Sequence, residues 1–452
     1  FLHALAPRCG AQCATALAVR EQHGRDEGAI PAPPPAAVVF AESTQDVQDA
    51  LKLADQHAVP VIPYGAGSSL EGHLLAVEGG ISLDLSRMNR ILSVNTEDLT
   101  VTVQPGITRK QLNDAIKDTG FFFPIDPGAD ASIGGMTATR ASGTNAVRYG
   151  TMRENVLALE LVTASGELMR TGTRAKKSSA GYDLTRLIVG SEGTLGVVTE
   201  ITVRLYPLPE AVSAAICSFP SIEAAVRTVI QTIQMGVPIA RVELVDVNSV
   251  RMVNAYSKLT LREEPMLLME FHGSPTGVKE QAEMAQDIAG EFGGNAFEWA
   301  ERPEDRTRLF TARHNAYFAA VSSRPGCRCI TTDACVPISR LADALLDSVR
   351  EADDSGIPYF LVGHVGDGNF HFGYLIDPDN EDERSRAEQL NHQLVSRSIA
   401  LGGTCTGEHG VGIHKMDFLR EEAGDGAVQM MRSIKQALDP NNILNPGKIF
   451  SL

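Results

Sequence analysis

The pattern of apolar and polar residues along this chain predicts short strands mixed with amphipathic helices. Residues 80–85 and 99–105 combine branched apolar residues with polar neighbours, which is typical of strands. Residues 43–57 and 108–119 repeat apolar positions every three or four residues, which is the period of a helix with one buried face. We therefore predict an α+β fold for this part of the chain.

The same mixture continues after Leu205-Tyr-Pro-Leu-Pro209, a stretch that we interpret as a domain boundary. Beyond it we predict helices over 220–235 and 338–355 and a strand over 240–244. Upstream, residues 1–36 begin with a helical piece and end in a stiff proline-rich linker. The pattern divides the chain into four parts, which are 1–36, 37–209, 210–413 and a helical segment 414–452.

Length and composition describe an ordinary soluble protein with room for two or three domains. The chain has 452 residues, of which 43% are hydrophobic and 21% charged. Its formal net charge of −16 argues against a nucleic-acid-binding surface, and no run of 18 apolar residues predicts a transmembrane segment. The 7 cysteines at irregular positions predict reduced thiols and hence a cytosol-like compartment.

The segment His364-Val-Gly-Asp-Gly-Asn-Phe-His371 carries the strongest chemical signal. Apolar and aromatic residues flank it over 358–364 and 370–376, and residues 366–369 are turn chemistry, so we predict a β-hairpin. In such a hairpin the two histidines would occupy opposed positions on paired strands, with Cβ atoms roughly 4.5–5.5 Å apart. That spacing suits two imidazoles that share one ion.

Downstream, Gly407-Glu408-His409-Gly410 adds a carboxylate and a third imidazole. His364, His371 and Glu408 together suit Zn²⁺, Mn²⁺ or Fe²⁺ with coordination positions left for substrate. The alternative is that the histidines are hydrogen-bonded structural residues of a glycine-rich hairpin. Only 11 histidines occur in the chain, and three of them lie in these two glycine-flanked patches beside acids, which favours a metal site.

Glycine-rich loops are the second signal. One follows the apolar run 58–62, and its small residues would let backbone N–H groups approach a phosphate. It is neither a G-x-G-x-x-G motif nor a P-loop, and a turn that serves packing alone is the alternative. Small-residue stretches recur over 127–137, 141–143 and 189–199, so we predict a long diphosphate ligand. The candidate residues are Pro63, Tyr64, Gly65, Ala66, Gly67, Ser68, Ser69, Gly72, Pro127, Gly128, Gly134, Gly135, Ser142, Gly143, Glu192, Gly196 and Val198.

Seven motifs follow one another along the chain. They are Pro-Tyr-Gly-Ala-Gly-Ser-Ser at 63–69, Ile-Gly-Gly-Met at 133–136, Lys-Ser-Ser-Ala-Gly-Tyr-Asp-Leu at 177–184, Gly-Ser-Glu-Gly-Thr-Leu-Gly at 190–196, the histidine hairpin, Gly-Glu-His-Gly at 407–410 and Leu-Asn-Pro-Gly-Lys at 444–448. Taken together, these motifs resemble one known family, the FAD-linked D-2-hydroxyacid dehydrogenases of the vanillyl-alcohol-oxidase superfamily. The similarity runs from about Ala37 to the end and is greatest to the cytochrome-type D-lactate dehydrogenase branch. The glycolate oxidase D subunit and D-2-hydroxyglutarate dehydrogenase are near relatives.

The resemblance implies a fold and a cofactor. It implies a two-subdomain FAD-binding domain of the PCMH type over 37–209 and a substrate or cap domain with an antiparallel sheet over 210–413. The C-terminal helical segment would return to the flavin and bring Asn445 to it. FAD would be bound non-covalently, because Ser68 stands where bicovalently linked relatives carry a histidine and His73 comes several residues later.

The resemblance also implies a mechanism. A 2-hydroxy acid held by one divalent ion would give its hydroxyl proton to His409 and its Cα hydride to flavin N5. The alternative is that the side chains of Glu408 and His409 diverge and leave one of them structural. Arg313 matches the family's substrate arginine, and its planar fork suits a carboxylate. Without the resemblance, an arginine on an amphipathic helix would be a surface residue.

The predicted substrate is based on three positions at which this sequence differs from relatives that act on D-2-hydroxyglutarate. These relatives carry a lysine near Thr331, a threonine near Tyr317 and an asparagine near Gly373, and this chain lacks all three. A second carboxylate would be buried without a partner, which costs several kcal/mol. We therefore predict a small D-2-hydroxy acid, with D-lactate first and D-2-hydroxybutyrate or glycolate next.

Partners and compartment follow from the same resemblance. Reduced FAD would pass electrons to a quinone, cytochrome c, an electron-transfer flavoprotein or oxygen, and a homodimer is an expectation. We expect a cytoplasmic protein, with the surface of the inner membrane as an alternative, or a mitochondrial matrix protein if a leader precedes Phe1. Three other classes remain open, which are a zinc hydrolase, a non-catalytic FAD-binding subunit and an ether-lipid synthase that uses FAD for non-redox alkyl transfer.

Overall fold

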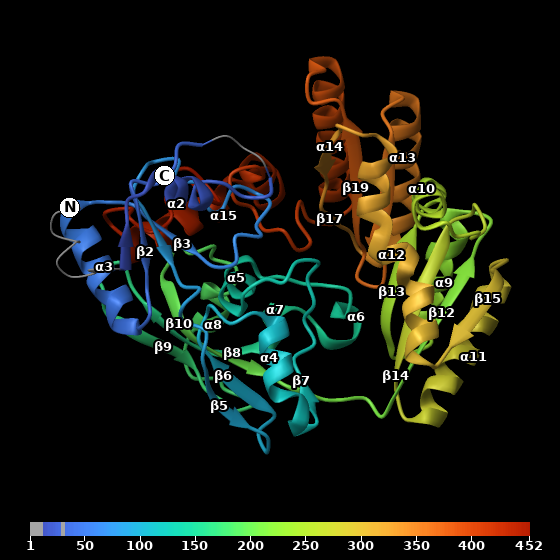
Figure 1. The fold of residues 1–452 in the computed structure, drawn as a ribbon, viewed down its shortest axis with the longest axis horizontal. Coiled ribbons are helices and arrows are strands. Elements are labelled where there is room, and N and C mark those ends of the chain that lie inside the picture. The colour runs from blue at the N-terminus through green and yellow to red at the C-terminus, as the bar shows by residue number, and fades with distance from the viewer. Residues whose placement is uncertain (1–11, 29–31) are drawn as a thin grey trace. The chain divides into compact units, whose positions relative to one another are not determined.

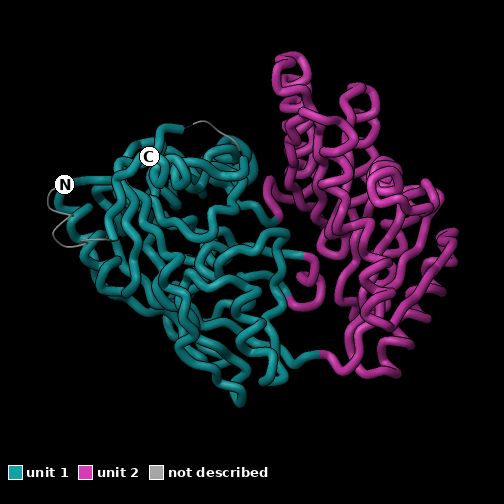
Figure 2. Tube along the Cα trace, in the orientation of Figure 1, with its two compact units in different colours: residues 1–143, 150–208, 408–452 teal, residues 144–149, 209–407 magenta. Residues whose placement is uncertain are grey.

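The computed structural model describes residues 12–28 and 32–452, which form two compact units (Figure 2). Unit 1 contains the chain up to Gly143, residues 150–208 and Glu408–Leu452. Unit 2 contains Thr144–Tyr149 and Pro209–Gly407. The longer segment of unit 2 thus begins at the last residue of the predicted boundary stretch. The roles that we assign to these parts of the chain stay predictions at this point.

The first sheet of unit 1, of which Figure 1 labels β2 and β3, has a parallel centre. Its strand order is β1, β2, β4, β3, and both β2 and β3 pair with β4 in parallel. The helix α3 (Thr44–His57) has Ser43 as its N-cap residue, and Ser43 and Asp46 form a reciprocal capping box. The apolar face of α3 packs in the core of this sheet. The strands are β1 Cys13–Ala14, β2 Ala37–Phe40, β3 Val61–Tyr64 and β4 Ile81–Asp84.

The second sheet of unit 1 is antiparallel throughout, in the order β5, β6, β10, β8, β9. Its inward residues pack with Ile133 and Met136 of α5 in a second apolar core. The strands are β5 Ile91–Asn95, β6 Thr100–Val103, β8 Val156–Val162, β9 Leu168–Gly172 and β10 Val197–Arg204. A separate two-stranded sheet pairs β7 Phe121–Phe122 with β11 Tyr206–Pro207. The helices are α2 Leu17–His23, α4 Arg109–Ile116, η2 Lys117–Thr119, α5 Ile133–Thr139, α7 Met152–Asn155 and α8 Leu184–Ile188.

The C-terminal segment of unit 1 lies against its first sheet. After α15 (Met416–Leu438), Val61 of β3 donates a backbone hydrogen bond to Ile443 at 2.7 Å and accepts one from Asn445 at 2.9 Å. The buried Lys435 ammonium donates to the carbonyls of Thr194 and Leu444 and pairs with Asp439. The end of the chain is therefore fixed to the strand that leads into the 63–72 loop.

Unit 2 is built on one eight-stranded antiparallel sheet. Its order is β15, β12, β14, β13, β18, β19, β16, and the short β17 also pairs with β19. The strands are β12 Ala211–Ser218, β13 Ile239–Val245, β14 Met266–Gly273, β15 Asn295–Ala300, β16 Arg328–Thr331, β17 Ala334–Cys335, β18 Tyr359–His364 and β19 Asn369–Ile376. The helices are α6 Ala146–Tyr149, α9 Ile222–Gln234, α10 Val247–Ser257, α11 Pro275–Glu291, α12 Pro303–Ser323, η3 Ile338–Arg340, α13 Leu341–Ser355 and α14 Glu381–Ala400.

One face of this sheet carries the site described below. Side chains that alternate along a strand point to opposite faces, so Phe360, Val362 and His364 share a face. Phe360 and Val362 pack in one apolar core with residues of α10 and α12, which therefore cover this face. On the other face, α9 packs on Val242 and Leu267. His364, the last residue of β18, thus follows these apolar residues on the same face of the sheet.

The predicted α+β fold with an antiparallel second sheet is confirmed. The helices predicted over 43–57, 108–119, 220–235 and 338–355 correspond to α3, α4 with η2, α9, and η3 with α13. Of the predicted N-terminal part, residues 1–11 and 29–31 lie outside the described residues. None of the helices in the described part of the chain combines the length and the apolarity that a membrane span needs.

Candidate functional site

The predicted hairpin forms, but its register differs from our expectation. We predicted His364 and His371 at opposed positions, and this prediction is wrong, because His364 pairs with Asn369 and His371 pairs with Val362. The turn takes residues 365–368, with Gly368 at φ 79°, so pairing already begins at His364. The two histidines are instead diagonal neighbours on one face of the sheet, with ring centroids 5.4 Å apart.

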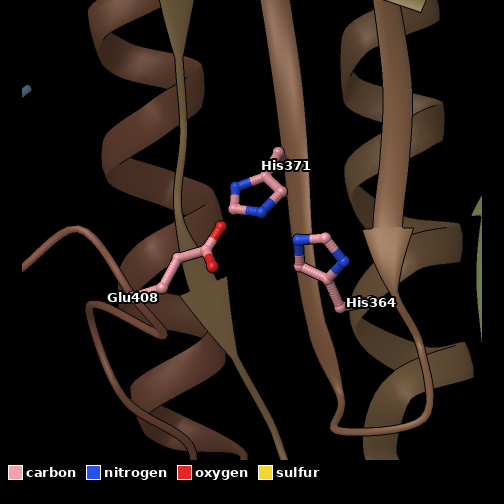
Figure 3. Close-up of side chains that lie close together, drawn as sticks. All are labelled: His364, His371 and Glu408. Carbon is pink, nitrogen blue, oxygen red and sulfur yellow. The ribbon is translucent and has the colours of Figure 1, made fainter. Parts of the chain in front are cut away.

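Glu408 joins the two histidines (Figure 3). One donor atom from each of the three side chains lies within 4.8 Å of the other two. Glu408 directly follows Gly407, with which unit 2 ends. The histidines are buried, at 7% and 6% exposure, so water is largely excluded from their rings. Two imidazoles and one carboxylate form a donor set that fits a divalent ion of the Zn²⁺, Mn²⁺ or Fe²⁺ type.

Both imidazoles are oriented by acceptors behind them. The His371 Nδ1 lies 2.9 Å from the Thr332 carbonyl, and the His364 Nδ1 lies 2.7 Å from the Glu243 carboxylate. A carbonyl and an ionised carboxylate can only accept, so each Nδ1 carries the proton and each Nε2 keeps its lone pair. The ring nitrogen opposite the acceptor is the one that can bind a metal ion.

Glu243 is a central residue of this group, and the sequence analysis missed it. It lies on β13 with no exposed surface, between the apolar residues Val242 and Leu244. Its Oε1 accepts from His364, and its Oε2 accepts from the Arg313 Nε at 2.7 Å. Burial raises the pKa of Glu243, but its contacts with His364 and Arg313 outweigh that effect and lower the pKa below its ordinary value. The sequence signal that could have identified Glu243 is a single acidic residue between apolar residues of a predicted strand.

Asp333 is a second buried carboxylate that joins parts of the group. It has no exposed surface, and it accepts from the Asn369 amide at 2.8 Å and from the Thr406 hydroxyl at 2.7 Å. Asn369 lies between the two histidines in the chain, and Thr406 lies two residues before Glu408. Asp333 therefore fixes the hairpin relative to the segment that carries the third donor.

His409 is held within unit 1 by Glu71. The His409 Nδ1 lies 3.3 Å from Glu71 Oε1, and the same carboxylate also binds His414 at 2.9 Å and Lys415 at 3.3 Å. Burial raises the pKa of Glu71, but Lys415, His409 and His414 lower it far below its usual range. Glu71 belongs to the 63–72 loop, so His409 is oriented by the loop that we predicted to bind a diphosphate. Sequence analysis did not identify this contact.

That loop leaves little room for side chains. A Cβ at Gly65 would lie 2.5 Å from the Ser132 hydroxyl, and one at Gly67, which has φ 76°, would lie 2.3 Å from the Tyr64 hydroxyl. The Ser69 Oγ is buried and has no hydrogen-bond partner among the described residues. A backbone-lined loop with a buried hydroxyl that lacks a partner fits a bound phosphate group.

Glu192 and Asn445 meet in unit 1. The Glu192 carboxylate accepts from the Val411 N–H at 2.7 Å and the Gly412 N–H at 2.9 Å, and it pairs with the His73 imidazole at 3.2 Å. The Asn445 amide donates to the carbonyls of Glu192 and His73. Within the described part of the chain, Asn445 Oδ1 is buried without a hydrogen-bond partner. Glu192 thus uses its carboxylate inside the protein, whereas Asn445 retains an acceptor for a ligand.

Other predicted cofactor residues are only partly brought together. Gly135 donates to Ser132 at the start of α5, next to Gly65, and a Cβ at Gly143 would lie 2.5 Å from Asp126 in the neighbouring loop. Gly196 packs on Leu161, and Val198 packs on the second apolar core. Gly134 and Gly72 are also closely packed, Pro63, Ser68, Pro127 and Ser142 are half-buried, and Ala66 and Gly128 are exposed.

Two family models match this chain. Residues 35–172 match the model for an FAD binding domain, and residues 208–449 match the model for the C-terminal domain of FAD linked oxidases. The second match alone covers more than half of the chain. The chain belongs to the FAD-linked oxidases. FAD is therefore its cofactor, as the predicted diphosphate loops implied.

Relatives of this FAD-linked oxidase span most of its length. It is 48% identical to the probable mitochondrial D-lactate dehydrogenase of Danio rerio, over 96% of this chain and 88% of that protein. It is 46% identical to the mitochondrial D-lactate dehydrogenase (cytochrome) of Arabidopsis thaliana, over 92% and 73%. The glycolate oxidase subunit GlcD of Bacillus subtilis is 36% identical, over 92% and 89%.

Solved structures show the same fold. A 4-ethylphenol oxidase from Gulosibacter chungangensis superposes with a TM-score of 0.78 at 21% identity, over 99% of this chain and 96% of that one. An alkyldihydroxyacetonephosphate synthase superposes with a TM-score of 0.75 at 20% identity, over 98% and 84%. At these identities the similarity supports the fold alone and gives no evidence for a shared activity.

Proposed function

We propose that this FAD-linked oxidase oxidises a small D-2-hydroxy acid to the 2-oxo acid, with D-lactate as the preferred substrate. The observation that carries the proposal is the group of His364, His371 and Glu408 in a chain that binds FAD. The relatives named D-lactate dehydrogenase, which are 48% and 46% identical, support the same reaction.

The donor group would hold one divalent ion that binds the substrate through its hydroxyl and carboxylate oxygens. Such an ion lowers the pKa of a bound hydroxyl, as it does that of bound water. FAD, when bound, supplies the hydride acceptor. His364 and His371 would each donate Nε2, because their Nδ1 atoms are engaged by Glu243 and Thr332.

His409 is the proposed general base. Its Nδ1 faces Glu71 at 3.3 Å, and we assign Nε2 as the atom that takes the proton from the substrate hydroxyl. Glu71 is buried and carries a negative charge, so it stabilises the imidazolium that forms. His409 is adjacent in sequence to the proposed ligand Glu408, but its ring partner comes from a different segment.

Arg313 is the proposed clamp for the substrate carboxylate. Its bond to Glu243 uses the Nε–H alone, so both Nη groups remain as a fork for a carboxylate. The side chain is 22% exposed, which fits a group that a substrate can reach. The same bond fixes the direction of the fork.

A small substrate side chain is supported by the packing around Phe360. A Cβ at Gly373 would lie 2.0 Å from the Phe360 ring, and the Tyr317 ring stands edge-on to Phe360 at 6.4 Å. Thr331 pairs with Gly373 on the neighbouring strand. An apolar ring thus occupies the space where D-2-hydroxyglutarate enzymes, in the resemblance above, carry an asparagine. A distal carboxylate would lose its hydration there without gaining a partner.

Glycolate is the second candidate substrate, because a relative at 36% identity is named glycolate oxidase subunit GlcD. A cytochrome is the proposed electron acceptor and the mitochondrion the proposed compartment, on the names of the 46% and 48% identical relatives. Non-covalent attachment of FAD and a homodimer stay predictions.

The test is the visible spectrum of metal-replete protein under anaerobic conditions, with D-lactate, L-lactate, glycolate and D-2-hydroxyglutarate added in parallel. We expect D-lactate to bleach the flavin band fastest and L-lactate not to bleach it. A flavin band that none of these acids bleaches would contradict the proposal. Fastest bleaching by D-2-hydroxyglutarate would overturn the substrate assignment and keep the reaction class.

A further inference from the structure

The Glu243 carboxylate touches both halves of the proposed substrate site. Its Oε1 lies 2.7 Å from His364 Nδ1, and its Oε2 lies 2.7 Å from Arg313 Nε. The three residues come from β13, β18 and α12 of unit 2. Glu243 thus joins the proposed metal ligand and the proposed carboxylate clamp, because both donate hydrogen bonds to its side chain.

Burial makes this carboxylate sensitive to its partners. Glu243 has no exposed surface, so water cannot replace a lost partner, and a buried carboxylate without partners is strongly disfavoured. With both partners present, each oxygen accepts one charge-assisted hydrogen bond. The two bonds therefore fix the rotamer of Glu243, and through it the ring of His364 and the fork of Arg313.

We propose that Glu243 is a positioning residue that sets His364 as an Nε2 metal ligand and aims Arg313 at the substrate carboxylate, so that one side chain aligns both contacts to the substrate. This inference rests on the proposed function of the site. An acceptor behind a metal-binding histidine fixes its tautomer and strengthens it as a ligand. Here the same acceptor also orients the clamp.

The substitution Glu243→Gln tests the proposal, because an amide offers one acceptor and one donor. Its NH₂ group would face either His364 Nδ1–H or Arg313 Nε–H, both of which are donors, so one of the two bonds must break. We expect metal affinity to fall by about 10–100-fold and the KM for D-lactate to rise in the same variant. Metal affinity is measured on metal-stripped, FAD-loaded protein by competition with a fluorescent chelator.

Two matched variants separate the parts of the proposal. Arg313→Lys should raise KM and should lower metal affinity less than Glu243→Gln does, because it removes one of the two bonds that fix Glu243 but keeps the carboxylate acceptor behind His364. Asp246→Asn changes another buried carboxylate, which bonds Ser249 and the Leu361 N–H, and should leave metal affinity and KM unchanged. Unchanged metal affinity in folded Glu243→Gln would overturn the proposal, whereas a wild type that binds no metal would overturn the proposed function instead.

A measurement on the wild type covers the case in which Glu243→Gln does not fold. The ¹⁵N spectrum of histidine-labelled protein, with His364 assigned from its loss in His364→Gln, reports which ring nitrogen carries the proton. We expect the Nδ1–H tautomer in the metal-stripped protein. An Nε2–H tautomer at His364 would overturn the role of Glu243.

Discussion

The proposed metal group, whose two histidines lie in unit 2, and the cofactor loops of unit 1 are built from different kinds of chemical group. The metal group consists of side chains, and buried carboxylates of Glu243 and Asp333 hold them in place. The cofactor loops consist largely of backbone, and at Gly65 and Gly67 they exclude even a Cβ. A site of side chains fails when one polar atom changes, whereas a site of backbone fails when one methyl group is added. Metal binding and FAD binding should therefore be lost independently.

The largest effect should come from removing a metal ligand. His371→Gln should abolish metal binding and lower turnover on the order of 10³-fold or more, because an ion of this kind supplies several kcal/mol of charge stabilisation. The FAD content should remain that of the wild type. Metal analysis, the flavin spectrum and D-lactate turnover measure the three quantities.

His272→Gln is the matched control for that variant. His272 lies in the same sheet and is buried, but it bonds Tyr149 and Glu270. Its substitution should leave metal content unchanged. A loss of FAD together with metal in His371→Gln would contradict the independence of the two regions.

The next effect concerns the proposed base. His409→Asn should lower kcat by about 10²–10⁴-fold, the usual contribution of a general base, with metal and FAD content unchanged. His414→Asn removes a second partner of Glu71 that is 31% exposed, and it should have a much smaller effect. Near-normal turnover in His409→Asn would remove the base role.

A methyl group added to the cofactor loop should weaken FAD binding and leave metal binding unchanged, which is the opposite of the result expected for His371→Gln. Gly67→Ala places a Cβ 2.3 Å from the Tyr64 hydroxyl at φ 76°, and we expect the Kd for FAD to rise roughly tenfold while metal affinity is unchanged. Gly79→Ala is the control, because Gly79 has a similar φ of 73° but nothing within 4 Å of its Cβ. Equal FAD affinity in both variants would contradict a close fit of the loop.

The change in substrate preference should be no larger than the change in FAD affinity. Phe360→Leu replaces the ring that fills the space at Gly373 with a smaller side chain. We expect the ratio of kcat/KM for D-2-hydroxybutyrate over D-lactate to rise about tenfold, since one methylene in a pocket contributes about 1–3 kcal/mol. A substrate panel measures the ratio, and an unchanged ratio would show that Phe360 does not limit the side chain.

The sequence predicted those parts of the fold and site that depend on local pattern. The apolar period of 43–57 and the cap at Ser43 give α3, and the turn residues after His364 give the hairpin. The donor group of His364, His371 and Glu408 was predicted, and the structure brings the three side chains together. The predicted register was wrong, because a shift in the turn residues changes which strand positions are opposed.

The residues that were missed depend on contacts between distant segments. Glu243 lies 121 residues from His364, and Glu71 lies 338 residues from His409, so no spacing in the sequence links them. The contacts of the Glu192 carboxylate with Val411 and Gly412 were also not predicted, and the role of Glu192 in binding the cofactor stays a prediction. Only the folded chain decides which partner a buried carboxylate finds.

The most direct test of the central claim is anaerobic flavin reduction by D-lactate before and after removal of the metal ion. We predict that chelated enzyme keeps its FAD spectrum but is not reduced by D-lactate, and that adding Zn²⁺ or Mn²⁺ restores reduction. Reduction of fully metal-stripped enzyme at the rate of the untreated enzyme would contradict the proposed role of His364, His371 and Glu408.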